Sequence, residues 1–188
     1  MRPIAVVNNY GQFNHLIHRT LRDLGIPVTL VSNTTDPDDI AERYGGIILG
    51  GGPAIERAGN CAQYLALGLP VLGICLGLHV IATASGGRVQ PGKSGGYGPV
   101  EVTICDHDAI LAGYPGSIRV WASHADEVVG IPPGFDLLAT SDICGAEAIA
   151  LPSRNLYGIQ WHPEVSHTED GNRIFENFYA IVREYGAC

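Results

Sequence analysis

Residues 69–82 read LPVLGICLGLHVIA and decide the fold, because an apolar run passes here into a segment of helical length at Cys75. A strand before the cysteine and a helix after it force it into a tight turn. Gly73 and Gly77 flank this turn, and without side chains they let the neighbouring backbone pass closely. The pattern is typical of a nucleophile elbow, where the positive end of a helix dipole also favours a thiolate. A packed turn without chemistry is the alternative that G-x-C-x-G alone leaves open.

Similar apolar runs recur through the first half of the chain, at residues 4–7, 27–31, 45–50 and 69–74. They are continuous rather than alternating, which indicates parallel strands that are buried on both faces. Stretches of helical length separate them, and residues 13–25 carry leucine and isoleucine at helical spacing before a terminal glycine. We therefore expect an α/β fold with a mostly parallel central sheet flanked by helices.

The second half of the chain is richer in strands. Apolar segments without long helices between them follow residue 87, at residues 100–104, 118–123, 136–141, 147–151 and 156–161. The last segment, residues 171–186, places apolar side chains on one helical face: Ile174, Phe175, Phe178, Val182 and Tyr185. These patterns predict additional β strands and a closing amphipathic helix, all within one domain that spans residues 1–188.

Composition argues against several classes of function. With a net charge of -8 and Lys93 as the only lysine, the chain lacks the basic clusters that bind a nucleic-acid backbone. Its 5 cysteines include no C-x-x-C pair, which disfavours a zinc site or a redox dithiol. No apolar stretch is long enough to cross a bilayer, and the N-terminus lacks a signal-peptide pattern. We expect a cytoplasmic protein that binds neither nucleic acid nor membrane and holds no metal.

Residues 87–94, GRVQPGKS, match the P-loop pattern letter for letter. That loop binds phosphate only between a strand and a helix, whose N-terminus helps to hold the anion. Here the pattern follows a helical segment and leads into the strand expected at residues 100–104. Nucleotide binding by this chain is therefore an alternative that the context argues against.

In addition to Cys75, candidate catalytic residues follow two other predicted strands. In IQWHPE a strand delivers His162, and Glu164 lies two positions later on the same side, where its carboxylate can orient the imidazole. In LGGGPA (49–54) a glycine-rich turn can present backbone N–H groups to an oxyanion, together with the N–H of Leu76. Because the carboxyl ends of parallel strands meet at one sheet edge, nucleophile, base and oxyanion donors should converge there.

Taken together, these motifs resemble those of a known family. GGP, GICLG and HPE, in this order, are similar to the motifs of the class I (triad) glutamine amidotransferases. YGQF near the N-terminus, SHADEV (123–128) and HPEVSHTEDG (162–171) resemble, more narrowly, the glutaminase subunits of archaeal two-subunit GMP synthetases. The resemblance covers essentially the whole chain and implies a class I glutamine amidotransferase-like (flavodoxin-like) fold.

The resemblance implies a role for each motif residue. Cys75 would be the nucleophile, His162 the general base and acid, and Glu164 the group that orients His162. The backbone N–H groups of Gly52 and Leu76 would stabilise the oxyanion. Three further residues would hold the glutamine backbone: Ser123, Ala125 and Asp126.

The implied reaction is hydrolysis of glutamine to glutamate and ammonia through a γ-glutamyl thioester. The ammonia would pass to a partner in GMP biosynthesis, a separate ATP-pyrophosphatase subunit that uses ATP and Mg²⁺ to convert XMP to GMP. We expect no cofactor in this chain, low activity when it is alone, and activation by the loaded partner.

A few positions depart from the family pattern. His79, one helical turn from Cys75, stands where the family has a substrate-contacting glutamine, and an imidazole lacks the reach of that amide. Asn8 and Asn9 stand where relatives often carry an aspartate, and Gly50 stands where they usually have a serine. Two alternatives stay open: the glutaminase subunit of anthranilate or aminodeoxychorismate synthase, and a non-catalytic regulatory module of the same fold.

Overall fold

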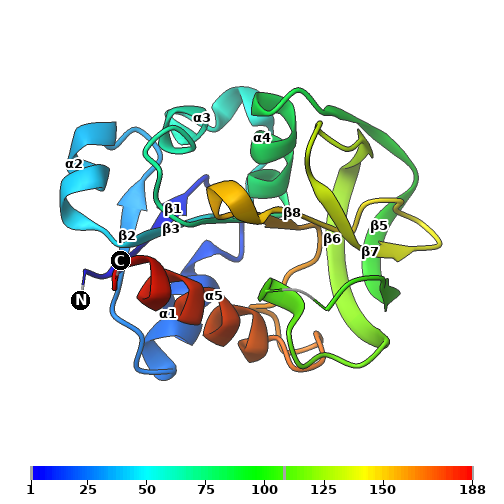
Figure 1. Cartoon of the computed structure of the whole chain (residues 1–188). Coiled ribbons are helices and arrows are strands. Elements are labelled where there is room, and N and C mark those ends of the chain that lie inside the picture. The colour runs from blue at the N-terminus through cyan, green and yellow to red at the C-terminus, as the bar shows by residue number, and fades with distance from the viewer. Residues whose placement is uncertain (1, 108, 188) are drawn as a thin grey trace.

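A β-sheet of nine strands forms the middle layer of the molecule (Figure 1). The computed structural model describes residues 2–107 and 109–187, apart from the side chains of residues 93–95. The strands are β1 (Ile4–Asn8), β2 (Val28–Ser32), β3 (Gly46–Leu49), β4 (Val71–Ile74), β5 (Arg88–Ile104), β6 (Ser117–Gly130), β7 (Asp136–Ser141), β8 (Ala148–Leu151) and β9 (Leu156–Ile159). They lie side by side in the order β2-β1-β3-β4-β9-β8-β7-β5-β6.

Helices cover both faces of this sheet. The α-helices are α1 (Asn14–Asp23), α2 (Pro37–Arg43), α3 (Cys61–Tyr64), α4 (Leu76–Ala84) and α5 (Asn172–Tyr185). Short 3₁₀ turns lie between them: η1 (Ile55–Arg57), η2 (Ala109–Leu111) and η3 (Pro152–Arg154). Figure 1 shows α1 and α5 on one face and α2, α3 and α4 on the other. The predicted α/β class, with helices flanking a central sheet, is confirmed.

The sheet has a parallel half and an antiparallel half. Strands β2, β1, β3, β4 and β9 pair in parallel, while β8, β7, β5 and β6 pair in antiparallel fashion. Strand β9 comes late in the chain but lies beside β4, where Ile159 pairs with Ile74. The predicted enrichment of strands in the second half is confirmed, and the carboxyl ends of β4 and β9 meet at one edge.

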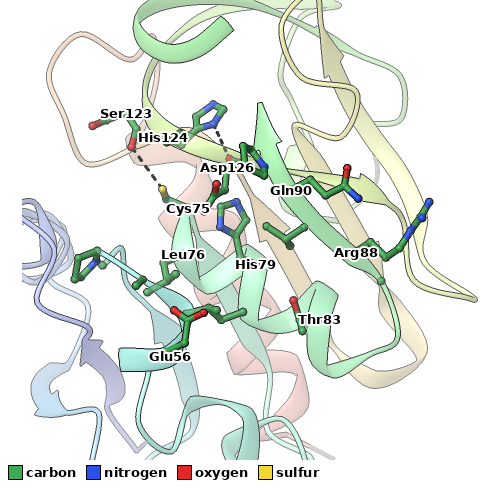
Figure 2. A pocket seen from close by; sticks show the side chains of 18 of the residues that line it. Glu56, Cys75, Leu76, His79, Thr83, Arg88, Gln90, Ser123, His124 and Asp126 are labelled. Atoms are coloured by element: carbon green, nitrogen blue, oxygen red, sulfur yellow. Dashed lines mark hydrogen bonds between the residues drawn. The ribbon is translucent and has the colours of Figure 1, made fainter. Parts of the chain in front are cut away.

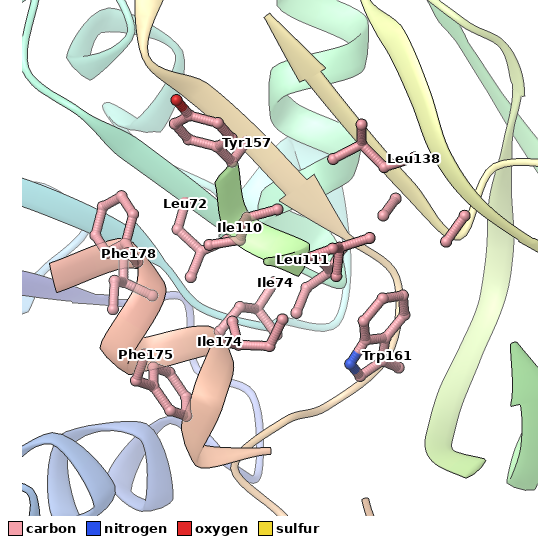
Figure 3. Close-up of a cluster of buried hydrophobic side chains, with 14 of the residues drawn as sticks. Leu72, Ile74, Ile110, Leu111, Leu138, Tyr157, Trp161, Ile174, Phe175 and Phe178 are labelled. Atoms are coloured by element: carbon pink, nitrogen blue, oxygen red, sulfur yellow. The ribbon is translucent and has the colours of Figure 1, made fainter. Parts of the chain in front are cut away.

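Apolar side chains fill the space between the sheet and the helices on each face. Along β1, Ile4 and Val6 pack on the side of α1 and α5, while Ala5 and Val7 pack on the side of α2, α3 and α4. Figure 3 shows Phe175 and Phe178 of α5 packed against sheet residues such as Leu72 and Ile74, on the side of α1 and α5. Burying each such side chain contributes roughly 1.5–3 kcal/mol. Burial on both faces explains why the strand runs are continuous rather than alternating.

Strand β5 is much longer than the segment expected at residues 100–104. It begins at Arg88 and pairs with β6 along most of its length, with a register shift between Pro91 and Gly96. The P-loop-like stretch therefore lies at the start of an antiparallel strand, which was not predicted; as its context did predict, it follows a helix and does not lead directly into one. The side chains of Lys93 and Ser94 in that stretch lie outside the described part of the structure.

The closing helix matches its predicted range, with one difference. Ile174, Phe175, Phe178 and Val182 are buried as expected. Tyr185, assigned to the same face by its spacing, is 40% exposed because it lies at the last residue of α5. Across the described residues, none of the helices combines the length and the apolar character needed to cross a membrane.

Replacing Gly77 by alanine should destabilise the fold. A Cβ there would lie 2.2 Å from the carbonyl oxygen of Leu49 and 2.8 Å from its Cβ, so β3 and α4 would have to separate. Alanine favours a helix by about 1 kcal/mol over glycine, but overpacking of this kind costs about 1–3 kcal/mol or more. We expect Gly77→Ala to lower the free energy of unfolding by about 1–2 kcal/mol in a urea titration.

The matched control is Gly116→Ala. Nothing lies within 4 Å of a Cβ at Gly116, so its free energy of unfolding should stay within about 0.5 kcal/mol of the original. A Gly77→Ala protein as stable as this control would show that the close approach of helix and strand is not a constraint.

Candidate active site

Cys75 occupies the turn between β4 and α4. Its φ of 54° and ψ of -105° place it in a region that costs a non-glycine residue about 1–3 kcal/mol. A Cβ on Gly73 would lie 2.4 Å from the carbonyl carbon of Gly77, so the neighbours of Cys75 must be glycines for the turn to close. The backbone N–H of Cys75 donates to the carbonyl of Ile159 at 2.9 Å. The predicted tight turn is present, and it ties β4 to β9.

His162 and Glu164 form a buried pair beyond the end of β9. Nδ1 of His162 lies 2.7 Å from Oε1 of Glu164, and the two residues are 4% and 7% exposed. The backbone N–H of His162 donates to the carbonyl of Trp121 on β6 at 3.0 Å. The side chain of Thr168 donates to the carbonyl of His162 at 2.6 Å. These contacts fix both the backbone and the ring of the imidazole.

The surroundings of His162 favour its charged form. Burial alone lowers the pKa of a histidine, but the hydrogen bonds and negative charges of Cys75 and Glu164 outweigh burial and raise the pKa of His162 to about 10. An imidazolium held between a sulfur and a carboxylate can donate a proton to a leaving group at neutral pH.

The glycine-rich turn after β3 is oriented by residues of the first strand-to-helix connection. The carbonyl oxygen of Gly51 accepts hydrogen bonds from the N–H of Gly11 at 3.1 Å and from Nδ2 of Asn14 at 2.9 Å. Because a trans peptide holds C=O and N–H in opposite directions, the N–H of Gly52 points away from Asn14. The N–H of Leu76, at the first position of α4, has no acceptor within the helix. Both N–H groups are thus available as donors to a ligand.

Three of the positions that depart from the family pattern support this turn. Nδ2 of Asn9 donates to the carbonyl of Gly50 at 3.0 Å, and Asn9 is fully buried. A Cβ on Gly50 would lie 2.3 Å from Oδ1 of Asn14. The side chain of Asn8 accepts from Nδ2 of Asn14 at 3.0 Å. Asn8, Asn9 and Gly50 therefore form one hydrogen-bonded and closely packed set around the turn.

A cavity of about 680 Å³ opens beside Cys75 (Figure 2). It brings together all of the residues predicted for the oxyanion and for substrate: Gly52, Leu76, His79, Ser123, Ala125 and Asp126. Sγ of Cys75 lies 3.7 Å from the carbonyl oxygen of Ser123. The cavity also includes Glu56, Arg88, Gln90 and Tyr97, which sequence reasoning did not single out. The last three lie on β5, whose early start was not predicted.

A second hollow, of about 240 Å³, lies on the His162 side of Cys75. Residues 10–13, the YGQF stretch, form part of its wall. The ring of Phe13 meets the ring of His162 edge-on, with 5.0 Å between the ring centroids. The two hollows share Gly52, Pro53, Cys75 and Ser123, so the sulfur is reached from two sides.

His79 and Gln160 form a second buried pair at the sulfur. Nε2 of His79 lies 2.8 Å from Oε1 of Gln160, and Nε2 of Gln160 donates to Sγ of Cys75 at 3.7 Å. His79 therefore lines the predicted pocket, but one of its ring nitrogens is engaged by the protein itself. Gln160 was missed by sequence reasoning. Its place two residues before His162 was the available signal.

The other described cysteines differ from Cys75. Burial raises the pKa of Cys61 to about 11 and the pKa of Cys144 to about 12, so both stay protonated near neutral pH. Cys105 is exposed and lies away from both hollows. Within residues 2–107 and 109–187, no group of three or more His, Cys, Asp and Glu side chains could hold a metal ion.

Comparisons with known proteins identify the family of this chain. The family model "Glutamine amidotransferase class-I" matches residues 5–182. A glutamine-hydrolyzing GMP synthase subunit of Methanoregula boonei is 68% identical over 184 residues, which are 98% of this chain and 100% of that protein. The protein of the same name from Methanospirillum hungatei is 65% identical, over 96% of each chain.

Solved structures show the same fold. The crystal structure of a Thermoplasma acidophilum protein assigned to the same GMP synthase subunit superposes with a TM-score of 0.94 at 35% identity, covering 100% of this chain and 96% of that one. A Thermotoga maritima glutamine amidotransferase superposes with a TM-score of 0.75 at 19% identity, over 97% of this chain and 83% of that chain, and is similar in fold alone. With the fold, the family model and close relatives in agreement, this chain belongs to the class I glutamine amidotransferase family.

Proposed function

We propose that this chain hydrolyses glutamine to glutamate and ammonia at Cys75 and supplies the ammonia to a separate subunit that converts XMP to GMP. The observation that carries the proposal is that Cys75 and His162 line the same smaller hollow, with His162 hydrogen-bonded to both Cys75 and Glu164. An activated cysteine needs such a base held by a third group. The names of the relatives support glutamine as the substrate and GMP synthesis as the purpose.

The first half of the reaction forms a thioester. The Cys75 thiolate attacks the side-chain amide carbon of glutamine, and the N–H groups of Gly52 and Leu76 stabilise the oxyanion that develops. His162 donates its proton to the amide nitrogen, the C–N bond breaks, and ammonia leaves. Glu164 holds the imidazole in the orientation and charge state that this transfer requires.

The second half releases glutamate. His162, now neutral, takes a proton from a water molecule, and the resulting hydroxide attacks the thioester carbon. The C–S bond breaks and returns the thiolate of Cys75, while His162 is again an imidazolium. Cys75 is therefore again a thiolate, and His162 is again protonated, at the end of each turnover.

The large cavity is where we place the body of glutamine. Ser123, Ala125 and Asp126 lie at its wall and, in this proposal, hold the amino-acid end of the substrate largely through main-chain groups. His79 lies near the sulfur in the same cavity, where it can contact the side chain of the substrate. His162 faces the smaller hollow and protonates the amide nitrogen from that side. In this proposal the ammonia is therefore released toward residues 10–13.

The partner belongs to the proposal as well. The relatives are named for one subunit of GMP synthase, which supports a second subunit that supplies the ATP-using step. We place ATP and Mg²⁺ in that second, ATP-pyrophosphatase subunit, with no cofactor in this chain. The rings of Tyr10 and Tyr97 are 61% and 70% exposed beside the two hollows, where a docked partner would cover them.

Replacing Cys75 should separate the two nitrogen sources. With the partner, XMP and ATP present, we expect Cys75→Ala to lower glutamine-dependent GMP formation by roughly 10⁴-fold or more, while ammonium-dependent formation stays unchanged. The matched control is Cys105→Ala, which removes an exposed thiol far from the cavity and should leave both rates unchanged. Loss of both rates in Cys75→Ala, or of neither, would contradict the proposal, and full glutamine-dependent activity would favour a non-catalytic module.

Glu164→Gln should change the pH profile as well as the rate. The carboxylate raises the pKa of His162, so its removal lowers that pKa and the imidazolium is lost at a lower pH. We expect the alkaline fall of kcat/KM for glutamine to move to lower pH in Glu164→Gln than in the original protein, with a loss of about 10²–10⁴-fold in rate. The measurement is glutamate release against pH in the complex. An alkaline limb that stays in place would show that Glu164 does not set the charge of His162.

The isolated chain should be a poor glutaminase. Hydrolysis without an acceptor wastes glutamine, so we expect slow glutamate release by the chain alone and strong activation by the partner loaded with ATP and XMP. The partner without ligands serves as the control. Equal rates with and without the loaded partner would contradict this prediction. They would not contradict the proposed reaction at Cys75.

A further inference from the structure

The side-chain amide of Gln160 bridges the nucleophile and a second histidine. Its Nε2 lies 3.7 Å from Sγ of Cys75, a hydrogen-bond distance for sulfur, and its Oε1 lies 2.8 Å from Nε2 of His79. Gln160 is 0% exposed. Its backbone N–H donates to the carbonyl of Glu147 at 2.8 Å, which fixes the chain from which the amide projects. A fully buried amide with both ends engaged has little freedom to turn.

The structure places the amide oxygen of Gln160 toward His79 and its N–H groups toward Cys75. A carbonyl oxygen only accepts, so Nε2 of His79 must carry the proton of that hydrogen bond. Burial lowers the pKa of His79 despite the hydrogen bond to Gln160, so the ring is neutral and Nε2–H is its single donor. Turning the amide over would set its NH₂ against that donor and its oxygen against the sulfur. In its Nε2–H tautomer, His79 therefore holds Gln160 with its N–H groups toward Cys75.

Besides His162, two polar groups lie at the sulfur, and they differ in what they can donate or accept. The carbonyl oxygen of Ser123, also at 3.7 Å, can only accept, so it can bind the S–H of a thiol but offers a thiolate no donor. The amide of Gln160 donates, so it favours the thiolate, and a donor binds a charged acceptor more strongly than a neutral one. Removing the amide would leave the carbonyl of Ser123 and tilt the balance toward the thiol.

We propose that Gln160 is a catalytic hydrogen-bond donor that stabilises the Cys75 thiolate, and that His79 is the positioning residue that keeps its amide in the donating orientation. The proposal rests on the proposed role of Cys75 as nucleophile. It gives His79 a task apart from any contact with substrate. The hydrogen bond from Gln160 would act twice in each cycle, because the thiolate is both the attacking group and the group expelled when the thioester is hydrolysed.

The test is the pH dependence of Cys75 alkylation by iodoacetamide, read by mass spectrometry of the peptide that contains Cys75. This probe needs neither glutamine nor a partner, so it can succeed even if the proposed glutaminase function fails. The midpoint pH is the readout, because a less stabilised thiolate is also more nucleophilic and the rate alone would understate the change. This midpoint pH belongs to the coupled Cys75–His162 pair rather than to the thiol alone.

Several titratable and charged groups line the cavity beside the sulfur or lie beyond β9, and the single variant Gln160→Met keeps all of them. They come from η1, α4, β5, β6 and the segment after β9: Glu56, His79, Arg88, Tyr97, His124, Asp126, His162 and Glu164. A change in midpoint then reports the amide itself.

We expect Gln160→Met to raise the midpoint by about one pH unit, the tenfold change expected from one hydrogen bond to a charged group. Methionine has a similar length and volume but no N–H to donate. His79→Leu should shift the midpoint in the same direction by less, because the amide remains but can turn. His79→Gln restores a donor to Gln160 and should return the midpoint to its original value.

The double variant Gln160→Met with His79→Leu tests the coupling. If His79 acts through Gln160, the double variant should show the midpoint of Gln160→Met alone, whereas independent contributions would add. Thermal unfolding checks that each variant is folded, and the His79 pair carries the test if Gln160→Met does not fold. An unchanged midpoint in folded Gln160→Met overturns the proposal, and additive shifts overturn the role of His79.

Discussion

The backbone turn at Cys75 is the constraint on which the rest of the site depends. A φ of 54° is unfavourable for cysteine, and the turn persists because its surroundings leave no alternative. Gly73 touches Gly77, and Gly77 touches Leu49 on the neighbouring strand. Strands β3 and β4 and helix α4 are thereby locked together at one point. The apolar clusters on both faces of the sheet offset the cost of about 1–3 kcal/mol.

Sheet order then brings distant segments to the sulfur. Strand β9 lies beside β4, so the chain that leaves its carboxyl end carries Gln160 and His162 past Cys75. Strand β6 pairs with β5 at the far edge, yet it supplies the carbonyl of Trp121 to His162 and the carbonyl of Ser123 to the sulfur. The long β5–β6 hairpin is therefore part of the site, because it closes over the carboxyl ends of the parallel strands.

The features that could be predicted from the sequence are those that depend on short stretches of neighbouring residues. Continuous apolar runs located the strands, and glycine and histidine motifs located Cys75 and His162, because each signal lies within a few residues. The early start of β5 was missed because GRVQPGKS and GGYGP have no apolar periodicity, and their strand comes from pairing with β6. Gln160 was missed for a similar reason. Its place two residues before His162 was the one local signal, and that spacing does not show which sulfur and which imidazole the side chain will meet in the fold.

His79 and His162 are equally buried histidines of the site, and the charge of each depends on whether its partner offsets the effect of burial. His79 and His162 are each 4% exposed, so burial disfavours the charged form of both. His162 faces a carboxylate at 2.7 Å, and its pKa is raised to about 10. His79 faces an amide at 2.8 Å, which brings no compensating charge, and its pKa is lowered. One imidazole can therefore supply a proton while the other stays neutral, because Glu164 and Gln160 offer oxygens of different charge at almost the same distance.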